Sequence, residues 1–150
     1  MTITYHRAAP ADLDPVRFYR LLELRVAVFV VEQAAAYPDL DGRDVEPGAE
    51  LLWAEEDGLV LATARVLRDL DGLRIGRVAT AAAARSRGVA SAIMRQAVER
   101  CVELAPDLPI RLDAQEHLSG WYARFGFVIS GEGFLEDDIP HVPMERPAAA

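Results

Sequence analysis

Six consecutive residues in the middle of the chain have the composition of a phosphate-binding turn. Residues 85–90 read Arg-Ser-Arg-Gly-Val-Ala and follow an apolar run that ends at Thr80. We expect a helix to begin at Arg85, and the first turn of a helix presents unpaired N–H groups and the positive end of its dipole. A phosphate placed there accepts several hydrogen bonds, and Gly88 lets it approach because glycine has no Cβ. The residues therefore predict a pyrophosphate site, although the six residues alone are equally compatible with an ordinary helix start.

Two other kinds of phosphate loop are excluded by the sequence. The nucleoside-triphosphate loop requires Gly-Lys-Ser/Thr, and the dinucleotide-binding fingerprint requires Gly-x-Gly-x-x-Gly. The chain has neither motif, and all 16 of its basic residues are arginines. The lack of lysine also excludes a Schiff-base mechanism.

The charges are unevenly distributed along the chain. The formal net charge is −8, which argues against a nucleic-acid binder held by general electrostatics. Between Arg65 and Arg100, however, eight arginines stand against three acids, for a local net charge of +5. From Glu32 to Asp57, nine acids stand against one arginine, and a second acidic cluster covers residues 132–138. Either these are ordinary solvated faces, or an anionic ligand binds near the middle segment and a cationic one near the acidic segments.

Size and composition fit one domain spanning residues 1–150. A chain of 150 residues with 51% hydrophobic residues can form a single hydrophobic core. No apolar run approaches the roughly 20 residues that a membrane span needs, and the N-terminus lacks the layout of a signal peptide. One cysteine, Cys101, permits no intrachain disulfide. We therefore expect a cytoplasmic protein that contacts no membrane.

The remaining sequence predicts alternating helices and strands. Asp14-Pro15 has the form of an N-cap followed by proline at the first helical position, and Asp-Gly pairs at 57–58 and 71–72 indicate hairpin turns. The expected elements are a helix over 15–31, a long loop over 34–48, strands over 51–56, 59–67 and 73–80, a helix over 85–103, a strand over 110–114, a helix over 117–125, and strands over 127–130 and 141–145. This order predicts an α/β domain with a mixed sheet.

Two motifs in this framework resemble those of the GCN5-related N-acetyltransferases (GNAT). The strand followed by Arg85-x-x-Gly88-x-Ala90 is similar to the family's Q/R-x-x-G-x-G/A motif, and residues 121–127, Trp-Tyr-Ala-Arg-Phe-Gly-Phe, resemble its Leu-Tyr-x-x-x-Gly-Phe segment. Residues 24–33, 37–44, 75–80 and 134–141 resemble the ElaA-type branch. The resemblance covers essentially the whole domain. It implies a GNAT-like mixed, mostly antiparallel central sheet flanked by helices, with strands splayed apart at the cofactor site.

The resemblance also implies acetyl-CoA as cosubstrate and assigns roles to particular residues. The pantetheine arm would pair with backbone groups around Val78, Ala79 and Thr80. Tyr122 matches the tyrosine that protonates the departing thiolate, a role that suits a phenol near sulfur. Gln115 stands where many relatives have an asparagine that contacts the cofactor. The pyrophosphate would lie over Arg85, Ser86, Arg87, Gly88, Val89, Ala90 and Ser91.

The acceptor implied by the family is an amine, which attacks the thioester directly while a base or water chain removes its proton. Candidate bases are Glu32, His141 and Asp113. We expect partial burial at the end of the first helix to raise the pKa of Glu32, whereas a solvated glutamate is an equal alternative. A strand histidine with a structural hydrogen bond is the alternative for His141, and Asp113 at a strand end favours a structural role. The loop acids Asp39, Asp41, Asp44 and Glu46 either attract a cationic amine or are simply solvated.

The sequence leaves three functional hypotheses. The first is an acetyl-CoA-dependent N-acetyltransferase acting on an amine of a small molecule or peptide. The second is a non-catalytic acyl-CoA-binding or sensing module, which the retained Tyr122 disfavours. The third is a transferase that uses another acyl donor, since the helix over 24–33 faintly resembles that of acyl-homoserine lactone synthases. No histidine or cysteine has metal-ligand spacing, and homodimerisation is compatible with the sequence although no feature demonstrates it.

Overall fold

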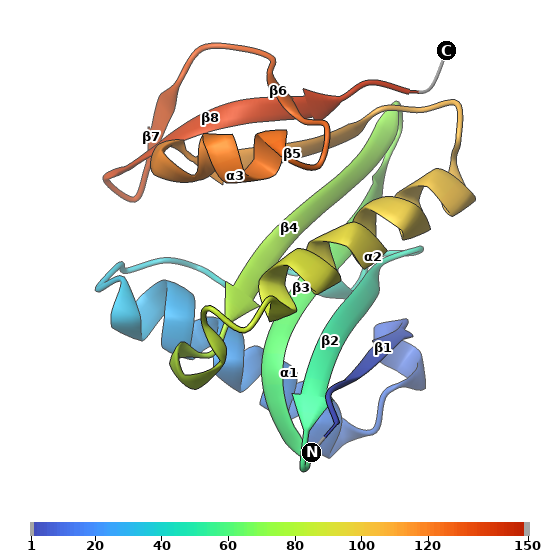
Figure 1. Cartoon of the computed structure of the whole chain (residues 1–150), viewed down its shortest axis with the longest axis vertical. Helices are drawn as coiled ribbons and strands as arrows, with labels where there is room; N and C mark the ends of the chain where they lie inside the picture. The colour runs from blue at the N-terminus through green and yellow to red at the C-terminus, as the bar shows by residue number, and fades with distance from the viewer. Residues whose placement is uncertain (1, 149–150) are drawn as a thin grey trace.

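The computed structural model describes residues 2–148 as an eight-stranded sheet with helices on both faces (Figure 1). The strand order is β1-β2-β3-β4-β5-β8-β6, and β7 also pairs with β8. The described strand pairs are antiparallel except for β4 and β5. The strands are β1 (Thr4–Ala8), β2 (Glu50–Glu56), β3 (Leu59–Asp69), β4 (Gly72–Thr80), β5 (Ile110–Gln115), β6 (Val128–Ile129), β7 (Phe134–Glu136) and β8 (Ile139–Arg146). The prediction of a mixed, mostly antiparallel sheet is confirmed.

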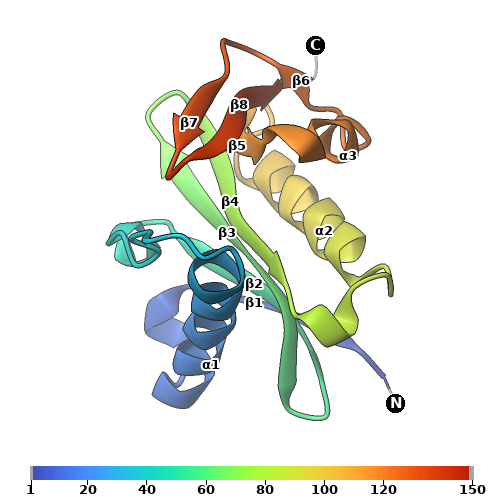
Figure 2. The same ribbon diagram turned by 90° about the vertical axis from the view of Figure 1, so that its left-hand side faces the viewer.

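The two long helices cover opposite faces of this sheet (Figure 2). Helix α1 (Pro15–Val26) lies on one face and α2 (Val89–Leu104) on the other. The short helix α3 (Ser119–Ala123) follows β5 and shares the hydrophobic core beneath α2. Short helical turns complete the fold at η1 (Pro10–Asp12), η2 (Ala27–Glu32), η3 (Arg43–Val45), η4 (Ala82–Ala84) and η5 (Glu116–Leu118).

Local sequence signals account for several of these boundaries. The Asp14 side chain accepts a hydrogen bond of 2.9 Å from the backbone N–H of Arg17, so it caps α1 as predicted. The β2–β3 hairpin turns at Asp57 and Gly58, both with positive φ, as a type I′ turn requires. Gly72 opens β4 where a Cβ would come within 2.8 Å of the Pro109 carbonyl oxygen, so this close approach needs glycine.

The structure differs from the sequence prediction at several element ends. The first helix ends at Val26 and passes into the π-helical turn η2, in which the N–H of Gln33 bonds to the carbonyl of Val28 at 3.3 Å. The predicted helix over 85–103 begins only at Val89, because Ser86 and Gly88 have positive φ. Strands β1 and β7 were not predicted, since both are short and lie along one side of a single partner strand.

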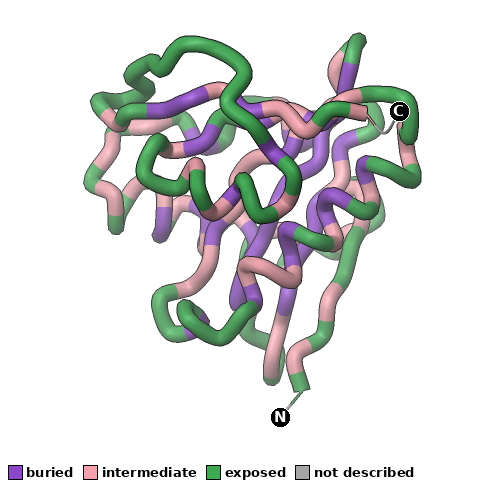
Figure 3. Tube along the Cα trace, turned by 45° about the horizontal axis from the view of Figure 1, so that its top comes forward, coloured by how far each residue is buried: buried purple, intermediate pink, exposed green. Residues whose placement is uncertain are grey.

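The largest core cluster lies between α2 and the centre of the sheet, and Figure 3 shows buried stretches along both. Met94, Ala97 and Cys101 lie three and four residues apart, so they fall on the buried stripe of α2. They pack with Tyr122 of α3 and Phe127 beyond it. Tyr122 is therefore positioned by the same core that holds α2 on the sheet.

Candidate active site

Strands β4 and β5 separate after a very short stretch of pairing, as the family resemblance implies. They pair in parallel only through Leu73 with Ile110 and Arg74 with Arg111. A bulge contributes to the divergence: two residues of β4, Arg77 and Val78, oppose a single residue of β3, and Arg77 has φ of 51°. Bulges bend a strand and end regular pairing. The backbone of β4 from the bulge to Thr80 is therefore without a partner strand on the β5 side.

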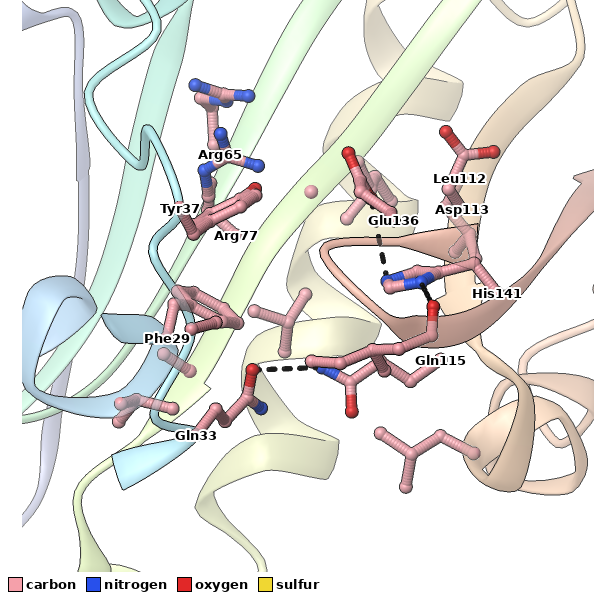
Figure 4. Close-up of a pocket in the computed structure, with 18 of the residues that line it drawn as sticks. Phe29, Gln33, Tyr37, Arg65, Arg77, Leu112, Asp113, Gln115, Glu136 and His141 are labelled. Carbon is pink, nitrogen blue, oxygen red and sulfur yellow. Dashed lines mark hydrogen bonds and ion pairs between the residues drawn. The ribbon is translucent and has the colours of Figure 1, made fainter. Parts of the chain in front are cut away.

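A cavity of about 850 Å³ opens where the two strands diverge. Its walls come from η2, the loop after it, β4, β5, α3 and the β7–β8 hairpin. Figure 4 shows side chains of Phe29 and Tyr37 on one side of the cavity and His141 with Glu136 on the other. Gln115 Nε2 donates a hydrogen bond to Gln33 Oε1 at 3.3 Å between these sides. The cavity thus spans both faces of the gap in the sheet.

The predicted cofactor residues fall into two groups, those that line this cavity and those that do not. Val78, Ala79, Thr80 and Gln115 line it, as do Arg85 and Ala90. Ser86, Arg87, Gly88, Val89 and Ser91 are not among its lining residues. The structure therefore brings the pantetheine-side residues to the cavity and leaves most of the predicted pyrophosphate turn outside it.

The turn before α2 has the geometry of an anion site. Gly88 is the N-cap residue with φ of 78° and makes no side-chain cap, so the first-turn N–H groups that start at Val89 have no side chain bound to them from the cap position. A Cβ on Gly88 would meet no atom within 4 Å. Backbone conformation, rather than room for the ligand alone, therefore explains why glycine is needed here.

Both arginines of this turn are held by carboxylates. Arg85 Nη2 lies 2.6 Å from Glu32 Oε1 and also donates to the Thr80 carbonyl at 3.2 Å. Arg87 binds both oxygens of Glu56, at 3.1 and 2.9 Å. An incoming phosphate can take over these guanidinium donors, because its oxygens are also charged acceptors.

The expectation that burial raises the pKa of Glu32 is wrong. Its side chain is 46% exposed, and the hydrogen bond from Arg85 lowers its pKa, outweighing the small effect of burial. A carboxylate held in this way is a weaker base. In this structure Glu32 orients Arg85, and the lining of the cavity includes both residues.

Tyr122 lies in the cavity wall with most of its ring in the core. It is 9% exposed, and the Trp121 ring packs edge-on against it with centroids 4.9 Å apart. Burial raises the pKa of Tyr122 to about 12. The phenol therefore keeps its proton at neutral pH, which suits the donor role that the family resemblance implies.

The other candidate bases have different surroundings. His141 is buried beside the cavity, with Nδ1 2.7 Å from the Ile139 carbonyl oxygen and Nε2 3.5 Å from Glu136 Oε2. Asp113 is exposed and its Oδ2 lies 3.5 Å from Arg74 Nη1, which fits the structural role predicted for it.

The loop acids are occupied by arginines. Arg25 is 1% exposed and binds Asp44 through two nitrogens, at 2.5 and 3.2 Å, and Asp39 at 3.1 Å. Arg65 binds both oxygens of Asp41, at 2.9 and 3.1 Å.

The remaining members of this group are equally paired. Arg77 Nε lies 2.9 Å from Asp39 Oδ1, and Arg43 Nε lies 3.0 Å from Glu46 Oε2. Both interpretations, as attractors of a cationic amine and as simply solvated acids, are wrong for Asp39 and Asp44, which are 2% and 5% exposed and bound to Arg25. The charges of Asp41 and Glu46 are likewise neutralised by arginines. The three aspartates instead anchor the loop to arginines of α1, β3 and β4, whereas Glu46 pairs within the loop.

The sequence did not single out Phe29 and Tyr37 as site residues, yet both line the cavity. Their rings lie 6.4 Å apart, and the Arg77 guanidinium lies over the Tyr37 ring at 4.8 Å. The one available signal was the long loop itself, since such loops are often functional. Helical spacing placed Phe29 in the first helix, where an apolar residue is expected to be core.

Comparison with known proteins identifies the fold. A family model for the acetyltransferase (GNAT) domain matches residues 19–147. The crystal structure of an acyl-CoA N-acyltransferase from Pseudomonas aeruginosa superposes with a TM-score of 0.92 and 40% identity, over 97% of this chain and 99% of that one. The crystal structure of Escherichia coli ElaA gives the same TM-score at 36% identity and the same coverage.

The chain belongs to the GNAT acetyltransferase family, in its ElaA-type branch. Protein ElaA of Escherichia coli K12 is 39% identical over 91% of both chains. The UPF0039 protein of Mycobacterium tuberculosis H37Rv is 44% identical over 99% of this chain and 96% of its own length. This GNAT protein is thus an N-acyltransferase of the acyl-CoA-dependent kind.

Two further findings concern the described part of this GNAT domain. Within residues 2–148, no group of three or more histidine, cysteine or acidic side chains is arranged to hold a metal ion. None of the helices in that range is long and apolar enough to cross a membrane.

The Arg87–Glu56 pair gives a first test of the pyrophosphate turn in this GNAT domain. We expect Glu56→Gln to tighten CoA binding by about two- to fivefold, because Arg87 no longer has to leave a carboxylate. Isothermal titration with CoA at low salt measures the change. Glu99→Gln is the matched control, since it removes the same charge from an exposed position on α2. Equal tightening in both variants would show that net charge, and not Arg87, is responsible.

Proposed function

We propose that this protein transfers an acetyl group from acetyl-CoA to a primary amine of a small molecule or peptide within a ternary complex. The observation that carries the proposal is the cavity of about 850 Å³ between β4 and β5. It joins residues expected to hold the donor, such as Thr80 and Ala90, to Tyr122 and to an acceptor side lined by His141. Donor and acceptor can therefore meet in one space, which favours direct transfer.

The residues present fit a CoA-derived cosubstrate. The uncapped first turn of α2 offers N–H groups to a phosphate, and Arg85 and Arg87 add charge. Beyond the bulge, the edge of β4 that faces β5 has no partner strand, so it offers peptide groups to an amide-containing arm. Acetyl-CoA, when bound, supplies an activated acetyl carbonyl and a thiolate leaving group.

The protein then has three roles in the transfer. The edges of β4 and β5 hold donor and acceptor close together. A base on the acceptor side removes a proton from the ammonium form of the acceptor, so that its nitrogen has a free lone pair. Tyr122, kept neutral by burial, donates a proton to the departing sulfur.

The donor preference and the need for an amine are tested together. We expect release of free thiol from acetyl-CoA to depend on an added primary amine, with longer acyl-CoA donors turned over at least tenfold more slowly. A thiol-trapping assay over a panel of primary amines and acyl-CoAs measures both. Thiol release with no amine dependence would contradict N-acyl transfer, and equal rates with octanoyl-CoA would contradict the acetyl preference. Cofactor-induced thermal stabilisation without any turnover would favour the binding-module alternative.

A further inference from the structure

His141 and Glu136 face each other across the β7–β8 hairpin as two hydrogen-bond acceptors (Figure 4). His141 Nδ1 lies 2.7 Å from the Ile139 carbonyl oxygen, which can only accept, so Nδ1 carries a proton. On the other side of the ring, Nε2 lies 3.5 Å from Glu136 Oε2. With the proton on Nδ1 alone, Nε2 carries a lone pair that points towards the Glu136 carboxylate. A ligand with at least two N–H or O–H donors can satisfy both atoms, and a positive charge on it is favoured because Glu136 is a carboxylate.

The hairpin holds this pair firmly. Phe134 is paired with His141 across the strands, and the two rings stack with centroids 5.7 Å apart. The turn residues Asp137 and Asp138 both have positive φ, as in a two-residue type I′ turn. The His141 side chain is only 10% exposed, whereas that of Glu136 is 46% exposed. The imidazole is thus fixed in orientation and the carboxylate remains open to an incoming ligand.

We propose that Glu136 and His141 bind the ammonium group of the acceptor, and that His141 Nε2 then takes a proton from it. This inference rests on the proposed N-acyl transfer. A primary ammonium has three N–H donors, so it can donate to the Glu136 carboxylate and to Nε2 at once. An alcohol has a single O–H donor and no charge, so it cannot satisfy both atoms. Asp137 also lines the cavity and adds negative charge beside the pair.

The proton transfers balance with Tyr122 as the acid. His141 Nε2 accepts the first proton from the ammonium and becomes an imidazolium paired with Glu136. The freed lone pair forms the bond from nitrogen to the acetyl carbon, and the bond from carbon to sulfur breaks. Tyr122 donates its proton to sulfur and regains one from the acylated nitrogen. His141 returns its proton to solvent, so each ammonium acylated releases one proton.

The opposite wall of the cavity indicates what carries the ammonium. Phe29 and Tyr37 present aromatic surface there, on the far side of β4 from His141 (Figure 4). The arginines behind them are paired with carboxylates, including Arg77 with Asp39. The wall therefore offers apolar contact and little free charge. A primary amine on an aromatic or apolar carbon chain has the matching shape and charge.

Binding of phenethylammonium tests the site without requiring turnover. We expect wild-type protein with CoA bound to bind phenethylammonium and to bind uncharged 2-phenylethanol at least tenfold more weakly. Glu136→Gln should weaken ammonium binding at least tenfold, because it keeps the shape and removes the charge. NMR titration, following the His141 imidazole signals, measures the dissociation constants. Asp138→Asn is the matched control: it removes a nearby charge, keeps a residue suited to positive φ, and should change binding less than twofold.

Three results of this titration would overturn the inference. They are no binding of phenethylammonium to the wild type, equal affinity of the wild type and Glu136→Gln, and an equal loss in Asp138→Asn. Each result differs from failure of the proposed function, which is absence of amine-dependent thiol release. Binding with the expected pattern but without turnover would support the ammonium site and contradict N-acyl transfer.

Steady-state kinetics distinguish the binding role of Glu136 from the proton-accepting role of His141. With an amine that the wild type acetylates, Glu136→Gln should raise the KM for the amine at least tenfold and leave the KM for acetyl-CoA within twofold. His141→Gln should lower kcat on the order of 100-fold. A purely structural role for the hairpin would instead change the two KM values together, which would count against the assignment.

Discussion

Replacement of Tyr122 by phenylalanine should lower kcat for amine acetylation by about 100-fold or more, the range for loss of a general acid. The phenol lies at the cavity wall and burial keeps it protonated, with a pKa of about 12. Phenylalanine preserves the edge-on contacts with Trp121 and Phe127 that fix the ring. We therefore expect little change in the KM for acetyl-CoA. Steady-state thiol release at saturating amine measures both constants.

Tyr37→Phe is the control for this experiment, because Tyr37 is the other tyrosine among the described residues that line the cavity. Its kcat should remain within about threefold of the wild type if Tyr122 is the acid. Since the Tyr122 pKa is raised well above neutrality, the wild-type rate should also show no loss from phenol ionisation up to about pH 10. A kcat for Tyr122→Phe close to wild type would exclude the acid role.

Arg25→Met should destabilise the fold by about 3–5 kcal/mol, the usual cost of leaving a buried charge without its partner. The guanidinium is 1% exposed and holds Asp39 and Asp44, which are 2% and 5% exposed. Methionine fills much of the same space but leaves two buried carboxylates with less compensation. Guanidinium chloride unfolding followed by circular dichroism gives the free energy of unfolding.

Arg20→Gln provides the comparison on the same helix. Arg20 pairs with Glu23 at the surface, with the two side chains 54% and 56% exposed, so its loss should cost less than about 0.5 kcal/mol. Adding Asp44→Asn to Arg25→Met should recover part of the lost stability, because one stranded charge is removed. Equal stability of Arg25→Met and the wild type would show that the ion pairs do not hold the loop.

The arginine–aspartate cluster also changes how the acceptor side is understood. Three aspartates of the loop, Asp39, Asp41 and Asp44, are neutralised by Arg25, Arg65 and Arg77. The loop therefore shapes the cavity wall without adding net negative charge to it. Burial alone would raise the pKa of Asp41, but hydrogen bonds from Arg65 and from the backbone of Arg43 lower it to about 2. The acidic groups left to meet a cationic substrate are those of the β7–β8 hairpin, which lies at the opposite side of the cavity.

Local sequence determined much of this protein. Asp14-Pro15 begins α1, and Asp57-Gly58 makes the first hairpin turn. The four-residue spacing of apolar side chains gives α2 its buried face. These features depend on neighbours within a few residues, so periodicity and turn chemistry are enough to predict them. The two GNAT motifs, read in order along the chain, also determined the family and the type of reaction.

Tertiary structure decided how the charged residues are used. The partner of Arg85 is Glu32, 53 residues earlier, and that of Arg25 is Asp44, 19 residues later. Whether a carboxylate is free, paired or buried depends on such distant contacts, which no local pattern encodes. Glu136 and His141 are only five residues apart, and a turn with two positive φ values folds β7 back on β8 to bring them together. Their position in the cavity, however, depends on the pairing of β8 with β5. Sequence motifs thus located the donor side, while the packing of a loop and a hairpin against the splayed strands created the acceptor side.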